Sequence, residues 1–287
     1  MSTVKQFFDL SSPRPHRYPG EGVGRLTGLE IEVEGVPAGE SNCPEGWDLT
    51  EDGSLRYNGA EYVSRPTALS DVPEALQRLY NAMPASHTFS MRTSTHVHVN
   101  AQDLTFDQVW AVTLLYGLVE PFMYEYVGRN RQYNIFCVPL NCSLSGEMGS
   151  TLAEASSQFS RPVPWSKYLG YNMASLNTHG TLEFRQMTGT NDLERLVTWV
   201  NMCHTVVETG RSLGIGGLTM ALEKIVTVQD WMTFVQNLFG AQPLKCGNSQ
   251  IERAILMTKG RMLPNPILPS LGTIQIHDFI NSFGGTL

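Results

Sequence analysis

Glu30, Glu32 and Glu34 alternate with aliphatic residues along the segment 25–34, RLTGLEIEVE. Successive side chains of a β-strand point to opposite faces, so the pattern places the three carboxylates on one face, about 6.6 Å apart. Carboxylates stacked in this way repel one another, and a divalent cation with oxygen ligands would turn the repulsion into coordination. An ordinary antiparallel strand with one solvated face gives the same alternation, so this pattern alone leaves both interpretations open.

A second strand pattern occurs in THVHVN, where His96, His98 and Asn100 share one face. Two imidazoles on one side of a strand suit a metal ion or a phosphate group, because neutral imidazole is a common metal ligand. Strand histidines also occur simply as hydrogen-bonded polar residues. The pattern therefore indicates a site only in combination with other segments.

Two further segments carry acidic residues with strand-like spacing. Glu61 follows the turn signal Asp52-Gly53, and the alternative to a site is a hairpin with an exposed Glu. In GTLEFRQM, Glu183 and Arg185 share a face. They fit either a cross-strand ion pair or a metal carboxylate beside a phosphate-binding guanidinium.

Four segments thus show the same division into a polar and an apolar face. If they join one sheet, the polar face is an acidic surface that costs free energy unless it is neutralised. Mg²⁺ with a polyphosphate is the simplest neutralising ligand. The sequence therefore predicts a magnesium–nucleotide site on that face.

The elements that would position these residues follow from periodicity and turn signals. We expect strands at 25–34, 61–64, 93–100, 167–176 and 181–187. We expect helices at about 70–83, at about 105–126 and after Asp192, with mostly helical structure beyond residue 211. The glycine-rich stretch 210–217 follows a helix and lacks a GKS/T ending, so we interpret it as a loop between helices. Early strands and late helices predict an α+β fold, with an antiparallel sheet covered by helices on one face.

Composition excludes several classes of protein. The 287 residues carry a net charge of −7, with 41% hydrophobic and 16% charged residues, which argues against disorder and against a nucleic-acid-binding surface. No apolar stretch reaches the roughly 18 residues of a membrane span, and the N-terminus lacks a signal-peptide core. Five cysteines without a CxxC pair predict a protein of a reducing compartment, in the cytoplasm. Oligomerisation is left open.

These motifs together resemble a known family. The segments GLEIE, GAEYVSRP, HVHVN and YNMASLNTHGTLEFR are similar, in order and spacing, to those of the amidoligases. This family is the COOH–NH2 ligase branch of the glutamine synthetase and glutamate–cysteine ligase superfamily. The resemblance covers about residues 25–210, and it predicts an arm at 1–24, a catalytic domain at 25–210 and a helical extension at 211–287 packed on that domain.

The resemblance implies a funnel-shaped antiparallel sheet of the glutamine synthetase type and a reaction that uses ATP and Mg²⁺. A substrate carboxylate, small-molecule or peptide, would be phosphorylated to an acyl phosphate and then attacked by an amine. The implied metal ligands are Glu30, Glu32, Glu61, His98 and Glu183. The implied nucleotide-binding residues are Arg129, Arg131, Lys167, Asn100 and Arg185. Arg185, Glu61 and Glu34 are the candidate catalytic residues, the last two as proton acceptors, while Asp52 and His96 match less closely.

Lys167 departs from the Arg expected at its position, and a lysine is a point charge without the bidentate fork. Three other functions compete with the ligase: a guanidino-kinase-like phosphotransferase on the same sheet, a zinc hydrolase, and a non-enzymatic binding protein with a decayed site. The sequence lacks HExxH, which argues against the hydrolase. The complete ExE, HxHxN and ExR sets argue against decay.

Overall fold

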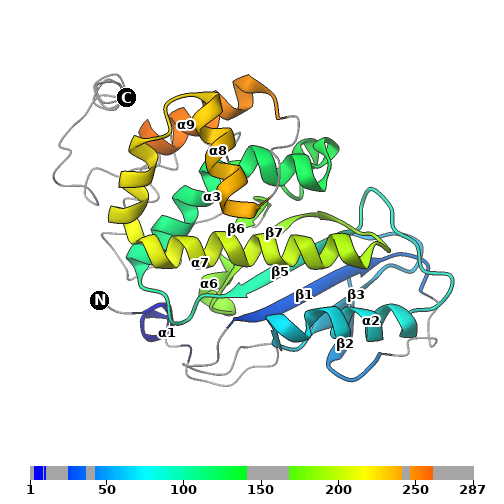
Figure 1. The fold of residues 1–287 in the computed structure, drawn as a ribbon. Coiled ribbons are helices and arrows are strands. Elements are labelled where there is room, and N and C mark those ends of the chain that lie inside the picture. The colour runs from blue at the N-terminus through cyan, green and yellow to red at the C-terminus, as the bar shows by residue number, and fades with distance from the viewer. Residues whose placement is uncertain are drawn as a thin grey trace. The chain divides into compact units, whose positions relative to one another are not determined.

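The computed structural model describes residues 3–8, 10, 25–36, 43–140, 168–240 and 246–260. The chain forms two compact units, which we call the sheet unit and the helical unit (Figure 1). The sheet unit comprises Val4–Asp103 and Gly170–His204; the helical unit comprises Met1–Thr3, Leu104–Leu169 and Thr205–Leu287. The domain boundaries expected at 24/25 and 210/211 stay predictions, and most of the expected arm lies outside the described residues.

The sheet unit is built on a seven-stranded sheet with the order β2-β3-β1-β5-β7-β6, and β4 also pairs with β1. Every strand pair in it is antiparallel. The strands are β1 (Leu26–Val33), β2 (Trp47–Glu51), β3 (Ala60–Ser64), β4 (Thr67–Ala68), β5 (Ser94–Asn100), β6 (Tyr171–Asn172) and β7 (Thr181–Thr188). The expected antiparallel sheet and α+β class are therefore present, whereas the funnel shape stays a prediction.

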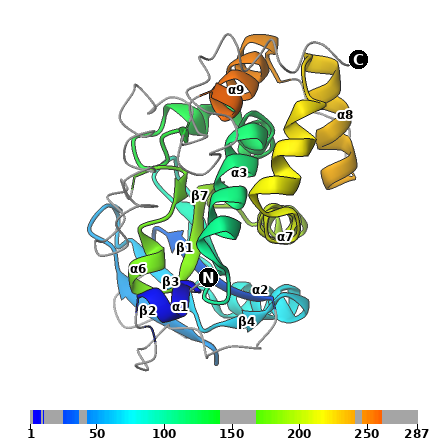
Figure 2. The same ribbon diagram turned by 90° about the vertical axis from the view of Figure 1, so that its left-hand side faces the viewer.

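One face of this sheet is apolar because each strand alternates. Leu29, Ile31, Val97 and Phe184 on this face are almost completely buried. Helix α2 (Val72–Ala82) and the first part of α7 (Leu193–Glu223) lie on the same side of the sheet (Figure 2). A hydrogen bond of 2.7 Å between Thr27 Oγ1 and His204 Nε2 ties β1 to α7.

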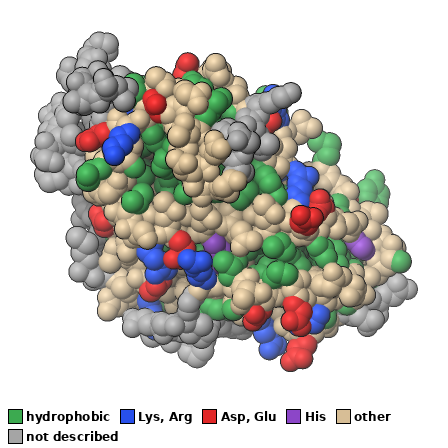
Figure 3. Space-filling view, in the orientation of Figure 1, with side chains coloured by type: hydrophobic (Ala, Val, Ile, Leu, Met, Phe, Trp, Pro, Cys, Tyr) green, Lys and Arg blue, Asp and Glu red, His purple; other side chains and the backbone are tan. Residues whose placement is uncertain are grey.

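The outer side of these helices carries the solvent-facing charges. Figure 3 shows charged side chains of both signs interspersed there with hydrophobic and polar ones. Glu74 and Arg78 of α2, for example, form an exposed i,i+4 ion pair of 2.6 Å. Exposed pairs of this kind contribute little stability, so the buried apolar contacts must hold the helix on the sheet. The short elements of the sheet unit are α1 (Val4–Phe7), η1 (Leu69–Asp71) and α6 (Ser175–Thr178).

The helical unit contains α3 (Phe106–Val127), η2 (Arg129–Tyr133), the rest of α7, α8 (Val228–Phe239) and α9 (Asn248–Gly260). Helix α3 begins at a capping box between Thr105 and Gln108. Trp231 donates a 2.8 Å hydrogen bond from Nε1 to the carbonyl of Leu118, which fixes α8 against α3. Within the part of the chain that the structure describes, no helix is long and apolar enough to cross a membrane.

Two expected elements differ from the structure. The strand expected at 167–176 is reduced, in the residues described, to the two residues of β6. The chain turns there because Asn172 Oδ1 accepts the amide of Ala174, and Ser175 Oγ donates to the carbonyl of Asn172. Residues 175–178 form α6 instead.

The loop between helices expected at 210–217 is present only as a kink: two helical stretches of α7 meet at Gly214, whose φ of 57° and ψ of −175° are not helical. A Cβ at Gly210 would come within 2.7 Å of the backbone of Val112 in α3. Glycine at this position therefore serves a close approach of two helices and does not mark a loop.

Candidate functional site

The polar face of the sheet collects acidic and imidazole side chains from four strands and one hairpin. The register pairs Glu32 with Glu61, Glu30 with His96 and His98 with Glu183. Asp52 adjoins this set from the β2–β3 hairpin. We call this set the acidic row; its members are Glu30, Glu32, Asp52, Glu61, His96, His98 and Glu183.

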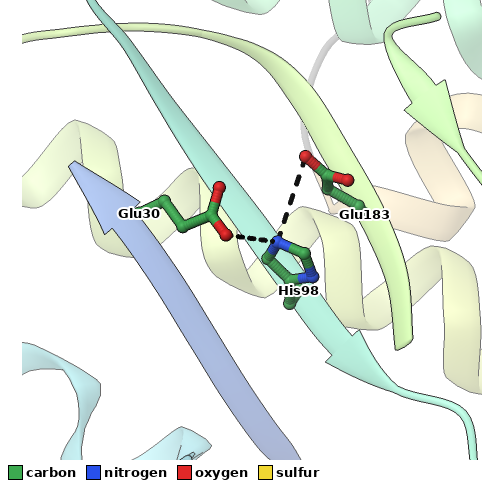
Figure 4. A group of neighbouring side chains, drawn as sticks. All are labelled: Glu30, His98 and Glu183. Atoms are coloured by element: carbon green, nitrogen blue, oxygen red, sulfur yellow. Dashed lines mark ion pairs between the residues drawn. The ribbon is translucent and has the colours of Figure 1, made fainter. Parts of the chain in front are cut away.

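At one end of the row, Glu30 of β1, His98 of β5 and Glu183 of β7 point toward one another (Figure 4). His98 Nε2 lies 3.1 Å from Glu30 Oε1 and 3.9 Å from Glu183 Oε1. One ligand atom from each of the three residues lies within 4.8 Å of the others. Three strands thus place one imidazole and two carboxylates around a common point.

Neighbouring side chains fix the orientation of these groups. His98 Nδ1 lies 2.8 Å from Thr181 Oγ1, which directs the other ring nitrogen toward the carboxylates. Asn172 donates a 2.6 Å hydrogen bond from Nδ2 to Glu183 Oε2. Partners of this kind set the orientation of metal-ligating side chains in proteins.

Arg185 contacts the same end of the row through an ion pair between its Nη1 and Glu183 Oε1. Val97 pairs with Phe184 and Thr95 with Met187, so Arg185 and Gln186 together oppose the single residue His96. One extra residue in β7 makes this a β-bulge, a feature that redirects side chains near functional sites. The Arg185 side chain keeps 18% of its surface exposed, so part of it remains accessible to an anion.

His96 joins the two ends of the row. Its Nδ1 lies 2.9 Å from Glu30 Oε2, and its Nε2 lies 2.8 Å from Ser94 Oγ and 3.6 Å from Glu32 Oε1. Glu32 Oε2 in turn accepts hydrogen bonds from the amide and the hydroxyl of Ser94, at 2.7 and 2.6 Å. These bonds satisfy the buried carboxylate of Glu32 on one side and leave its other oxygen, Oε1, turned toward His96.

The opposite end of the row consists of carboxylates alone. Oxygens of Glu32, Asp52 and Glu61 lie within 4.8 Å of one another, and Glu61 also belongs to a middle group with Glu30 and His96. Among the described residues, the hydrogen bond that the Glu61 carboxylate accepts is a long one, 3.4 Å from Thr50 Oγ1. Negative charge is therefore less compensated at this end.

The pKa values of Glu61 and His98 reflect the different surroundings at the two ends of the row. Burial raises the pKa of Glu61, and repulsion from Glu30, Glu32 and Asp52 adds to it against the pull of His96, giving a value of about 7. Burial alone would lower the pKa of His98, but Glu30 and Glu183 raise it to about 9.

The carboxylates at the imidazole end shift the other way. Burial opposes ionisation of Glu30, yet attraction to His98 and hydrogen bonds from both imidazoles hold its pKa well below its usual value. Burial likewise raises the pKa of Glu183, but Arg185 and His98 outweigh it and lower that pKa. Glu30 and Glu183 are therefore ionised near neutral pH, whereas Glu61 is about half protonated.

The donor set fits divalent cations. Carboxylate oxygens are the ligands that Mg²⁺ prefers, and imidazole nitrogen accepts several divalent metals. Burial and the neighbouring carboxylates of Glu30, Glu32 and Asp52 raise the pKa of Glu61, and a bound cation would favour its ionised form. The three overlapping groups, which share Glu30 and Glu61, could hold more than one ion along the row.

A cavity of about 180 Å³ opens beside the row. Its lining includes Glu30, Glu61 and His98 from the row and, next to them, Gly28, Val63, Pro66 and His179. The His179 ring meets the His98 ring edge-on, with 5.7 Å between their centres. A ligand in this cavity would therefore be in contact with the acidic row.

Two of the sequence-predicted residues on this side of the molecule have other contacts. The carboxylate of Glu34 accepts a 2.9 Å hydrogen bond from the amide of Arg56, and Glu34 belongs to none of the three close groups. Asn100 is the next residue after His98 on the polar face of β5. Its Oδ1 accepts a 3.2 Å hydrogen bond from the amide of Gln102. Their catalytic and nucleotide-binding roles stay predictions.

Two of the remaining predicted cations belong to the helical unit, and the third lies outside the described residues. Arg129 and Arg131 belong to the helical unit, where Arg129 Nε forms an exposed ion pair of 2.5 Å with Glu125 and Arg131 is buried. Lys167 lies outside the described residues. A role of these three residues in nucleotide binding stays a prediction.

The sequence did not point to Ser94, Asn172, Thr181 or His179 as functional residues. Ser94 and Thr181 share the period-two polar face with His96 and Glu183, so their positions were a usable signal. Asn172 and His179 flank the short helix α6, where the expected strand pattern was wrong. No signal in that segment indicated that both would face the row.

The fold and the row define an α+β protein whose antiparallel sheet carries a candidate metal centre on its polar face. A family model described as "Putative amidoligase enzyme" matches residues 37–207, more than half of the chain. The chain belongs to this amidoligase family, and is thus of the ligase type of enzyme. The match includes Asp52, Glu61, His96, His98 and Glu183 but begins after Glu30 and Glu32. No curated protein matches the chain.

Proposed function

We propose that the protein is an ATP- and Mg²⁺-dependent ligase that joins a carboxylate to an amine through an acyl phosphate. The observation that carries the proposal is the convergence of Glu30, His98 and Glu183 from three strands, with Glu61 close by. Membership of the amidoligase family supports the bond formed, and the donor set supports the metal ion.

The chain's own residues would bind the ions. Glu30, His98 and Glu183 form one ligand group, and Glu32, Asp52 and Glu61 form another. When bound there, Mg²⁺ would neutralise the charge of the ATP phosphates during phosphoryl transfer. Thr181, Asn172 and Ser94 hold the ligand side chains in place before the ions bind, so little reorganisation is needed.

Arg185 is the residue suited to the transferred phosphoryl group. Its fork of N–H donors matches phosphate oxygens, and its contact with Glu183 places it at the imidazole end of the row. A phosphate there would find a cation fixed in advance, as stabilisation of a transferring group requires. Phosphorylation of the substrate carboxylate supplies the leaving group that a free carboxylate lacks.

Glu61 is the residue suited to accept the proton that the amine loses. When it binds no cation, its pKa of about 7 leaves it about half ionised at neutral pH and basic enough to take a proton. It also lines the cavity beside the row. Protein side chains form no covalent bond with substrate in this scheme, so no nucleophilic residue is required.

The test is a reaction screen with ATP and Mg²⁺ over mixtures of carboxylates and amines, analysed by mass spectrometry. We expect an amide product with release of ADP and phosphate, and none without ATP or with excess EDTA. A phosphorylated amine without an amide would instead indicate the phosphotransferase. Absence of any ATP-dependent product across the screen would count against both.

A further inference from the structure

The cavity beside the acidic row has a lining unlike that of an anion site. Glu30 and Glu61 form its charged wall, and Val63 and Pro66 form an apolar wall. None of the residues that line it, within the described chain, is Lys or Arg. An anionic group there would face two carboxylates, and the cationic group in the lining, His98, is already paired with Glu30 at 3.1 Å, so an anion is unfavourable in this partly buried site.

We propose that this cavity binds the amine substrate, as a primary ammonium group on a short apolar carbon chain. The ammonium would lie against Glu61, whose carboxylate accepts only a long hydrogen bond of 3.4 Å from Thr50 among the described residues. The carbon chain would lie along Val63 and Pro66. The role of this amine as a substrate rests on the proposed ligase function. The binding of an ammonium group in the cavity does not depend on it.

The size of the cavity agrees with a small ligand. Its volume of about 180 Å³ is below the roughly 300–1,000 Å³ of pockets for drug-sized molecules. Gly28 contributes to this space because it lies on the polar face opposite His98, where any other residue would project a side chain. The cavity therefore suits an aminoalkyl group and is too small for a whole nucleotide.

The position of the cavity matches the chemistry. Glu30 and His98 line it and also belong to the ligand group with Glu183, beside Arg185. An amine in the cavity would lie next to the place where the carboxylate is activated. Proximity of this kind converts the second step into an effectively intramolecular one.

The test compares n-butylammonium with n-butyrate, which have the same chain length and opposite charge. Each is titrated into the full-length protein in EDTA and without ATP, so that Glu30 and Glu61 carry no metal ion, and binding is followed by ligand-observed NMR. We expect saturable binding of butylammonium and at least tenfold weaker binding of butyrate. Equal or tighter binding of butyrate, or displacement of butylammonium by an equal concentration of adenosine, would overturn the assignment.

A pair of variants locates the site. Val63→Phe fills the apolar wall and should weaken butylammonium binding at least tenfold. Thr67→Phe adds bulk on the neighbouring strand β4, outside the cavity lining, and should leave the affinity unchanged. Circular dichroism checks that both variants fold. If one variant does not fold, the comparison of butylammonium with butyrate on the wild-type protein still tests the proposal. Unchanged binding to folded Val63→Phe would place the amine elsewhere. Because no ATP is present, this outcome is independent of the ligase test.

Discussion

At the imidazole end of the acidic row, Glu30 and Glu183 face His98 and Arg185; at the carboxylate end, Glu32 and Glu61 face Asp52. The same residue type behaves oppositely in the two places. The pKa of Glu183 is lowered although burial opposes it, whereas that of Glu61 is raised to about 7. The sheet therefore supplies its own counter-charges at one end and leaves the other end dependent on a cation.

His98 and Glu61 both make the free energy of unfolding fall as the pH rises, but over different pH ranges. The raised pKa of His98, about 9, stabilises the folded state below the ordinary value of 6.5, and this contribution is lost as the pH rises through 9. The raised pKa of Glu61 means that the folded state holds a proton that the unfolded state releases at 4.5. The free energy of unfolding therefore falls as the pH rises from 4.5 through about 7.

The largest effect is expected from Glu183→Gln at the imidazole end. The variant keeps the shape of the side chain but removes a charged ligand atom beside His98. Loss of a partner that merely orients a ligand costs about 10–100-fold, so loss of the ligand itself should reduce kcat of the ATP-dependent reaction by more than about 100-fold. Steady-state kinetics measure this.

Glu74→Gln is the matched control, because Glu74 lies on the exposed face of α2. It should retain wild-type kcat. A folded Glu183→Gln enzyme with wild-type activity would remove Glu183 from the metal centre and with it the convergence on which the proposed function depends.

Mg²⁺ should stabilise the protein mainly through the carboxylate end. An ion at 100 times its dissociation constant raises the free energy of unfolding by about 2.7 kcal/mol. Glu61→Gln should reduce this gain, because Glu61 takes part in two of the three close groups. Urea unfolding with Mg²⁺, compared with NaCl of the same ionic strength, measures the difference. An identical gain in the variant would mean that the ion binds elsewhere.

The pH dependence of stability separates the two ends without any metal. In EDTA, Glu61→Gln removes a carboxylate whose ionisation opposes folding above pH 7. The free energy of unfolding of the variant minus that of the wild type should be more positive at pH 8 than at pH 4. We expect the change to be about 1–2 kcal/mol, after allowance for partial solvent screening. Urea unfolding at both pH values measures this, and a difference that is the same at both would contradict the raised pKa.

Much of the row was predictable because strand alternation is a local property of the sequence. Glu30, Glu32, His96 and His98 lie on one face of β1 and β5 as their spacing predicts. The register between strands is not local, and it decides which residues meet. Asp52 joins Glu61 only through the β2–β3 hairpin, and the sequence left its place in the site open.

The parts that could not be predicted depend on single side chains acting against the local pattern. The side-chain oxygen of Asn172 accepts a hydrogen bond from the amide of Ala174, which ends β6. The nitrogen of the same side chain donates a hydrogen bond to Glu183. Gly210 looks like a loop residue until its contact with Val112 is known. In both places a tertiary contact overrides the periodicity, as is usual near functional or closely packed positions.

The smallest effect, and the finest test of how the imidazole end is preorganised, is expected from Thr181→Val. Valine keeps the shape of the side chain and stays buried, but it removes the oxygen 2.8 Å from His98 Nδ1. The ring then loses the contact that directs Nε2 toward Glu30, so kcat should fall about tenfold and the Mg²⁺ concentration for half-maximal activity should rise. Thr188→Val, at the far end of the same strand, should change neither quantity. A general loss of packing would lower the unfolding temperature but leave the Mg²⁺ requirement unchanged. If Thr181→Val does not change the Mg²⁺ concentration for half-maximal activity, the threonine has a structural role only. The comparison between the two ends would then depend on Glu183 and Arg185 alone.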